Sequence, residues 1–74
     1  MELTIRLFAN FRDGRFREAA KVYEPGTTVG AIVDGLGIPR GEVGVLFLNG
    51  RHTEFEVAPS PQDTVSIFPK VGGG

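Results

Sequence analysis

The one amphipathic helix that this sequence can form restricts its fold more than any other feature. Apolar residues follow the i, i+3, i+4, i+7 spacing of a single helical stripe at Val29, Ile32, Val33 and Leu36. Thr28 is suited to cap the start of this helix, Gly37 suits the left-handed position after a helix, and Pro39 prevents continuation. A helix with one apolar face must cover a second element, and the flanking segments are predicted to provide it.

Two strand-like segments precede the helix. Residues 2–8 alternate with the period of two that is typical of a half-buried strand. Its inward side would carry Leu3, Ile5 and Leu7. Residues 19–24 predict a second, weaker strand, and the polar residues 10–17 predict the long, mobile loop of a β-hairpin.

Further strands follow the helix. Residues 43–48 are almost entirely apolar, and Asn49-Gly50 is a type I′ turn signal that leads into a strand at 51–55. Residues 64–68 form the last predicted strand. The order is therefore ββαβββ, or ββαββ if the fourth strand is short.

This order leaves few topologies. The helix must cover one face of the sheet, and a right-handed crossover then places the last strand beside the first. We therefore predict an α+β fold of the β-grasp type, a mixed sheet of four to five strands with one crossover helix on one face. The first and last strands should be central, adjacent and parallel.

Composition excludes several kinds of chemistry. The 74 residues are expected to form one small domain, in whose core a deep catalytic pocket is improbable. The sequence has no cysteine, a single histidine (His52) and a net charge of −1, so thiolate or polyhistidine metal sites and a polybasic nucleic-acid surface are not expected. Since no long apolar run occurs, we expect a cytoplasmic protein without a membrane span and without a bound metal or cofactor.

Three motifs have a structural explanation and a functional one. The glycine-rich residues 35–41 resemble a nucleotide-binding loop, but they end a helix instead of opening one, which favours helix termination. His52 fits an exposed strand position better than a metal site. The arginines of residues 12–17, interleaved with Phe11 and Phe16, suggest either a small RNA-binding loop or a solvated, partner-facing loop.

The last residues form a separate feature. After Phe68-Pro69-Lys70-Val71 the sequence ends in Gly72, Gly73 and Gly74. Residues without a Cβ atom can pass through a channel too narrow for any side chain, although terminal residues are also often disordered. Composition alone does not distinguish the two interpretations.

The closing motif resembles a known family. Asp63-x-Val65-x-Ile67-Phe68-Pro69-Lys70-Val71-Gly72-Gly73-Gly74 is similar to D-x-V-x-h-F-P-P-V-A-G-G, the ending of the MoaD/ThiS ubiquitin-like sulfur carriers. Leu7-Phe8-Ala9 resembles the MoaD-type branch, the small subunit of molybdopterin synthase. Lys70 and Gly72 depart from the pattern, where the family has proline and a small, alanine-like residue.

The resemblance implies a carrier and not an enzyme. It predicts a β-grasp domain over residues 1–69 and a flexible tail over residues 70–74. In this family an ATP-dependent adenylyltransferase activates the terminal carboxyl group, here that of Gly74, and the acyl-adenylate is converted to a thiocarboxylate. Gly72 and Gly73 would allow the tail to thread into the partner enzymes, which supply the catalysis.

The resemblance also implies the acceptors of the sulfur. A MoaD-type protein delivers it to the large subunit of molybdopterin synthase, for the molybdenum or tungsten cofactor. A ThiS-type protein delivers it to thiazole synthase in thiamine synthesis. Attachment of Gly74 to protein lysines, as a ubiquitin-like modifier, and an interaction module with an inert tail remain alternatives. No nucleic-acid or membrane partner is expected.

The strand phases predict where such partners bind. If Leu3, Ile5 and Leu7 face the helix, Phe8 faces the open side of the sheet, and Phe68 lies beside it on the parallel last strand. Phe47 joins them if Leu46 and Leu48 fill the core; the reverse arrangement, with Phe47 in the core, is the alternative. We therefore predict partner binding by Phe8, Phe47, Phe68, Pro69 and Val71.

Overall fold

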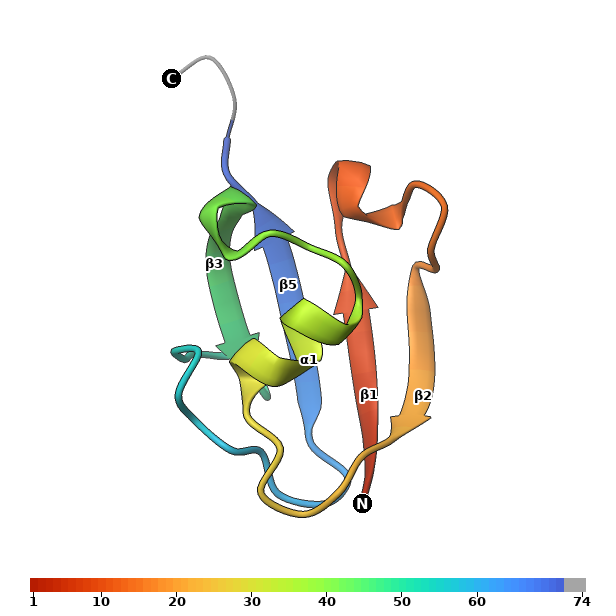
Figure 1. The fold of residues 1–74 in the computed structure, drawn as a ribbon, viewed down its shortest axis with the longest axis vertical. Coiled ribbons are helices and arrows are strands. Elements are labelled where there is room, and N and C mark those ends of the chain that lie inside the picture. The colour runs from red at the N-terminus through yellow and green to blue at the C-terminus, as the bar shows by residue number, and fades with distance from the viewer. Residues whose placement is uncertain (72–74) are drawn as a thin grey trace.

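The computed structural model describes residues 1–71 (Figure 1). Its strands are β1 (Glu2–Leu7), β2 (Glu18–Val22), β3 (Val43–Leu48), β4 (Arg51–His52) and β5 (Thr64–Pro69). Its helices are α1 (Val29–Gly35) and two short 3₁₀ helices, η1 (Ala9–Arg12) and η2 (Arg40–Glu42). Within the described residues, no helix has the length and apolar character needed to cross a membrane.

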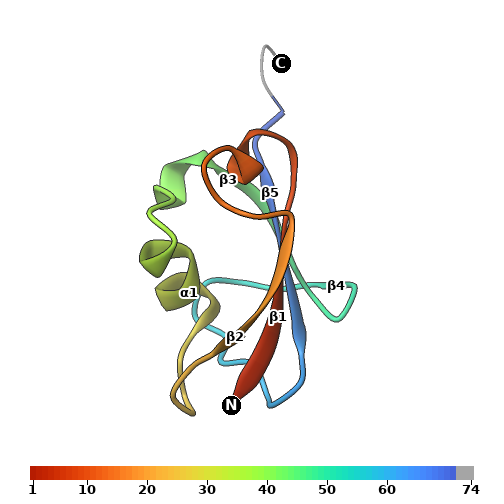
Figure 2. The ribbon, with the colours of Figure 1, turned by 90° about the vertical axis from the view of Figure 1, so that its right-hand side faces the viewer.

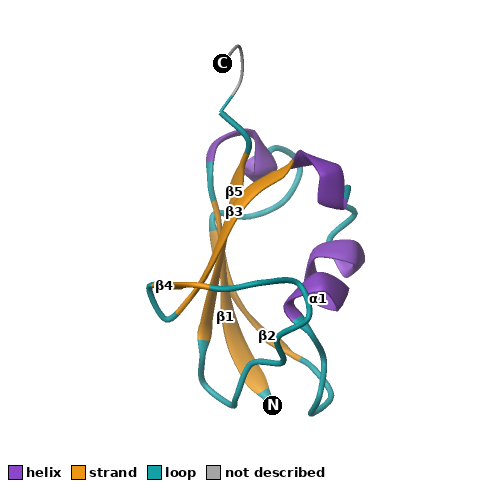
Figure 3. Ribbon diagram, turned by 90° about the vertical axis from the view of Figure 1, so that its left-hand side faces the viewer, coloured by secondary structure: helices purple, strands orange, loops and turns teal. Residues whose placement is uncertain are grey.

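The five strands form one mixed sheet in the order β2-β1-β5-β3-β4. β1 and β5 are parallel and central, and the other neighbouring strands are antiparallel. Helix α1 lies across one face of the sheet, and none of the described residues forms a helix on the opposite face (Figures 2 and 3). The predicted β-grasp architecture is confirmed, including the central parallel pair.

The core lies between α1 and the inner face of the sheet. The inward positions of β1 alternate as predicted, and Leu3, Ile5 and Leu7 are fully buried. The helix contributes Val29, Ile32 and Val33, and the other strands contribute Leu46, Val65 and Ile67. Burying one such aliphatic side chain stabilises the fold by about 1.5–3 kcal/mol, so these contacts hold a helix whose own propensity is weak.

Both ends of α1 have the predicted chemistry. The Thr28 hydroxyl accepts a hydrogen bond from the Ala31 amide at 3.1 Å. Gly37 has a φ of +74°, which favours glycine because a Cβ atom is strained there. The Gly37 amide donates to the Asp34 carbonyl and the Ile38 amide to the Val33 carbonyl, which completes a Schellman motif. The glycine-rich segment therefore terminates the helix.

Two predicted segments differ in the structure. The expected mobile loop over residues 10–17 instead begins with η1, whose Phe11 is only 3% exposed and belongs to the core. The fourth strand ends at His52 and not at residue 55, because the chain then turns to the start of α1. There the carbonyl groups of Phe55 and Val57 accept hydrogen bonds from the first helical amides, each at 2.8 Å.

One ion pair fixes the end of α1 to η2. The Arg40 guanidinium donates to both carboxylate oxygens of Asp34, at 3.0 and 2.9 Å. The same guanidinium lies 5.0 Å from the centre of the Phe55 ring. The hydrogen bonds from Arg40, with its positive charge, hold the pKa of Asp34 below its usual value.

This pair predicts a pH dependence of stability. Because the Asp34 pKa is lower in the folded protein than in the unfolded chain (about 3.9), the pair stabilises the fold above that pH. The stabilisation is lost as the pH falls through the lowered, folded-state value. We expect Asp34→Asn to lower the unfolding free energy at pH 7, and the deficit to shrink as the pH falls below about 4. Urea unfolding at several pH values measures it.

A matched control is Asp13→Asn, which neutralises an exposed aspartate outside the pair. Its difference from the wild type should depend less on pH in this range. Equal pH profiles for the two variants would contradict the role of the Asp34–Arg40 pair.

Candidate functional site

Three phenylalanines gather on the open face of the sheet. The rings of Phe8 and Phe68 are stacked, with centroids 3.9 Å apart and an angle of 10° between their planes. The Phe47 ring meets Phe68 edge-on at 5.7 Å. We call these three residues the aromatic patch. Its geometry is as predicted from the strand phases, and the alternative with Phe47 in the core is wrong.

The backbone explains how the aromatic patch forms. Leu7 pairs with Ile67 across the parallel β1 and β5, so the next residue of each strand points to the opposite face at the same level. Phe8 keeps an extended conformation, with φ −128° and ψ 153°, before η1 begins. On the other side of β5, Val45 pairs with Phe68 and Phe47 with Ser66. All three rings are half-buried and keep part of their surface accessible.

The chain leaves the sheet at the end of β5 (Figure 1), directly after Phe68 of the aromatic patch. Pro69, the last residue of β5, is half-buried and pairs with Val43. The Lys70 amide then donates to the Glu42 carbonyl at 3.0 Å, and Val71 is 93% exposed. The predicted tail residues Gly72, Gly73 and Gly74 lie outside the described residues. The root of the tail is thus fixed to η2.

Gly44 permits this close approach of β3 to the root of the tail. The register between β3 and β5 shifts between Val43 and Val45, which makes Gly44 the extra residue of a β-bulge. A Cβ atom at Gly44 would lie 2.6 Å from the Pro69 carbonyl oxygen and 2.8 Å from Lys70 Cα. Both atoms belong to the backbone, so any side chain here displaces the root of the tail.

We therefore expect Gly44→Ala to lower the unfolding free energy by about 1–3 kcal/mol, as overpacking that shifts the backbone does. The Lys70 amide should also exchange its hydrogen faster in the variant, because the added methyl group would strain its hydrogen bond to the Glu42 carbonyl. Urea unfolding and hydrogen exchange measure the two effects. Gly41→Ala is the matched control, because no atom lies within 4 Å of the added methyl group. If both variants behave alike, Gly44 does not set the position of the tail.

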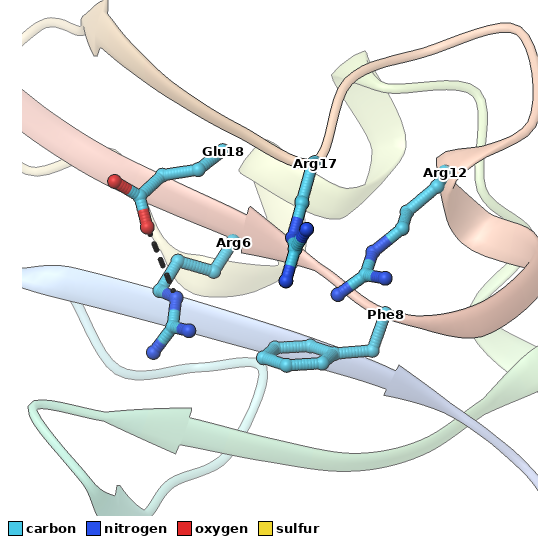
Figure 4. Close-up of a pocket in the computed structure, with 5 residues that line it drawn as sticks. All are labelled: Arg6, Phe8, Arg12, Arg17 and Glu18. Carbon is cyan, nitrogen blue, oxygen red and sulfur yellow. Dashed lines mark ion pairs between the residues drawn. The ribbon is translucent and has the colours of Figure 1, made fainter.

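A second feature of the open face adjoins the aromatic patch. An open pocket is lined by Arg6, Phe8, Arg12, Arg17 and Glu18, and we call it the basic pocket (Figure 4). The guanidinium carbons of Arg6 and Arg12 each lie 5.3 Å from the centre of the Phe8 ring. Arg6 is also paired with Glu18 at 3.1 Å. Phe8 therefore belongs to both the aromatic patch and the basic pocket.

The basic pocket was not predicted from the sequence, although the strand pattern of β1 already indicates part of it. The alternation of β1 already places Arg6 on the same face as Phe8. The position of Arg12 depends on η1, where its Nε atom donates to the Leu7 carbonyl at 2.7 Å. With Phe11 buried, the alternating aromatic and basic surface that an RNA-binding loop would need is not present on this segment.

The sequence raised one further candidate residue, His52, and the possibility of a metal site. His52 is exposed on β4 beside Phe47, and its Nδ1 atom lies 3.8 Å from Glu54, in agreement with the exposed strand position. Among residues 1–71, no group of three or more potential metal ligands occurs. What the described site offers is a half-buried aromatic surface, a cationic pocket and a fixed point of chain exit.

Comparisons with known proteins place this arrangement in a family. The sequence model described as Mut7-C ubiquitin matches residues 2–72. The search of curated proteins finds no match. Among solved structures, the HVO 2177 protein of Haloferax volcanii is 32% identical, with a TM-score of 0.77, over 100% of this chain and 87% of that one.

Two further structures share the fold. Small archaeal modifier protein 1 of Haloferax volcanii has a TM-score of 0.77 at 22% identity, with 100% of both chains covered. A chain from the complex of subunits 1 and 2 of the Helicobacter pylori molybdopterin-converting factor has a TM-score of 0.67 at 20% identity, also with 100% of both chains covered. The ubiquitin-like fold that the resemblance implies is thus confirmed. Since the family model spans nearly the whole sequence, the chain belongs to the Mut7-C ubiquitin family.

Proposed function

We propose that this protein is a sulfur carrier whose Gly74 carboxyl group is adenylated and then converted to a thiocarboxylate. The sulfur is delivered to the large subunit of molybdopterin synthase, in synthesis of the molybdenum or tungsten cofactor. The protein itself is a carrier, and its partner enzymes perform the catalysis. The observation that carries the proposal is that three glycines follow a chain exit that is fixed beside a half-buried, partly accessible aromatic surface.

The chemistry needs activation because a carboxylate is a poor electrophile. A terminal carboxyl group has a pKa of about 3.3–3.7 and is an anion at neutral pH. Its oxygen attacks the α-phosphorus of ATP in the activating enzyme, and pyrophosphate leaves. Hydrosulfide then adds to the acyl carbon, the bond to AMP breaks, and a thiocarboxylate remains. No side chain of the carrier takes part in these steps.

The fold relatives support this choice of pathway. One of them is a chain of a complex of the two subunits of a molybdopterin-converting factor. We infer a large-subunit partner of the same kind here, docked on the aromatic patch while the tail enters its active site. The activating enzyme would use the same surface at another time, because both partners must reach Gly74.

A second candidate function is conjugation of Gly74 to protein lysines. It is favoured by the likeness in fold to small archaeal modifier protein 1, which is named as a modifier. Carrier and modifier share the adenylated intermediate and differ in the nucleophile that displaces AMP. In one case this is a sulfur anion, and in the other it is a lysine amine.

Reconstitution distinguishes these functions. The protein is incubated with ATP, hydrosulfide and the activating enzyme of the same organism, and its intact mass is measured. A carrier gains the mass of one sulfur in place of one oxygen. The large subunit of molybdopterin synthase, supplied with its pterin precursor, then transfers this sulfur to the pterin and restores the carboxylate. Restoration by thiazole synthase with its own substrates instead would assign the thiamine pathway. Denatured cell extracts that contain high-mass conjugates and no thiocarboxylate would favour the modifier. If neither conjugates nor a thiocarboxylate are found, both proposed functions are wrong.

A further inference from the structure

We infer that the basic pocket binds acidic side chains of the protein partner that covers the aromatic patch. The inference rests on the proposed function only in assuming that such a partner docks here. It assigns to the partner a defined chemistry, one or more aspartate or glutamate carboxylates placed beside an apolar area. The two surfaces are continuous because Phe8 belongs to both.

The arginines of the basic pocket differ in how they are held. Arg6 is largely neutralised by Glu18, at 3.1 Å. The Nε atom of Arg12 is bonded to the Leu7 carbonyl, which orients the guanidinium and leaves its terminal nitrogens for a ligand. Among the described residues, the Arg17 side chain makes no hydrogen bond or ion pair. Figure 4 shows it directed toward Phe8, beside Arg12.

Two neighbouring guanidinium groups, those of Arg12 and Arg17, match the chemistry of carboxylates. A guanidinium presents its donors in a planar fork that holds a carboxylate through two parallel hydrogen bonds. Arg12 is already fixed by the backbone, so it loses less side-chain freedom on binding than an unrestrained arginine. The guanidinium of Arg17, the residue directly before β2, would then donate hydrogen bonds to the same carboxylate from the other side of the pocket.

The charge distribution favours a localised acidic contact. The residues of the basic pocket include three arginines and one glutamate, a formal charge of +2. Since the whole chain carries −1, all other residues together carry −3. A partner with acidic groups is therefore attracted more strongly to this pocket than to the rest of the protein, whose net charge is negative, and this difference orients the complex.

The same observations argue against single-stranded RNA. Recognition of such strands uses aromatic rings on which bases stack. The Phe8 ring is stacked on Phe68, and the guanidinium groups of Arg6 and Arg12 lie near its centre, so it offers no free face to a base. A net positive charge of two is also small for a phosphate backbone.

The test is an NMR titration of the full-length, ¹⁵N-labelled protein with a hexaglutamate peptide as the probe. The side-chain Nε–H resonances of Arg12 and Arg17 are expected to shift on binding. Arg17→Gln should weaken peptide binding by about two- to fivefold, the range of an exposed ion pair. Arg51→Gln is the matched control, since it removes the same charge from β4, outside the pocket, and should leave the affinity nearly unchanged.

Two outcomes would overturn the inference. Equal losses for Arg17→Gln and Arg51→Gln would mean that the peptide senses only net charge. Tighter binding of a uridylate hexamer than of hexaglutamate at the same resonances would assign the pocket to nucleic acid. Because the titration contains neither ATP nor a sulfur source, it is independent of the thiocarboxylate assay, and failure of one leaves the other interpretable.

Discussion

Removal of Gly74 is expected to reduce adenylation by the activating enzyme by at least about 100-fold and to abolish thiocarboxylate formation. The shortened chain still ends in a glycine and a carboxyl group, but that group stops about 3.4 Å short of its place in the partner's active site. A misplacement of about 1 Å can already cost about 100-fold in rate. Pyrophosphate release and intact mass measure the two effects.

The fold should be unaffected by this change. All the residues of the buried core precede Pro69, and the core ends with Ile67 on β5. The thermal midpoint of the shortened protein should therefore equal that of the wild type. Appending one alanine after Gly74 is the complementary variant, since it moves the carboxyl group in the other direction and should be equally inactive. Full thiocarboxylate yield from either variant would disprove the role of Gly74.

Phe68→Ala is expected to weaken binding of the activating enzyme by about 10- to 100-fold, because one buried phenylalanine contributes about 1.5–3 kcal/mol to an interface. Phe68 is the central ring of the aromatic patch, stacked on Phe8 and in edge contact with Phe47. Loss of these two ring contacts should lower the unfolding free energy by about 1–3 kcal/mol. Calorimetric titration and urea unfolding measure the two quantities separately.

Phe16→Ala provides the control for this variant. Phe16 is also half-buried, packs against the core and lies 5.2 Å from the Lys21 ammonium, away from the aromatic patch. It should cost stability and leave affinity unchanged. If Phe16→Ala and Phe68→Ala reduce affinity equally, the aromatic patch is not the docking surface and the change in affinity reflects stability alone.

Much of the fold could be predicted because its signals are local. The alternation of Leu3, Ile5 and Leu7 needs only the period of a strand, and the caps of α1 need only Thr28 and Gly37. A short fourth strand was one of the two predicted possibilities, but the residue at which β4 ends could not be predicted, because it follows from the need of the first α1 amides for acceptors on a distant segment. Phe11 was assigned to a loop because a single apolar residue among polar ones shows no periodicity.

Part of the candidate site could likewise be predicted from the sequence, and part could not. The aromatic patch follows from strand phase together with one topological fact, the parallel pairing of β1 with β5. The basic pocket depends on the path of a non-repetitive segment, which brings Arg12 and Arg17 to the side of Arg6. The role of Gly44 appears only once the register of β3 against β5 is known, although a glycine within an apolar strand is a typical sign of a bulge.

Tandem mass spectrometry of the terminal peptide, from protein purified from its own cells, tests directly whether Gly74 carries sulfur. Cleavage after Lys70 releases the residues that follow it, Val71 to Gly74. We expect a fraction of this peptide in which one oxygen of the Gly74 carboxyl group is replaced by sulfur. A peptide that carries only an unmodified carboxyl group in cells engaged in cofactor synthesis, or that continues beyond Gly74, would contradict this expectation.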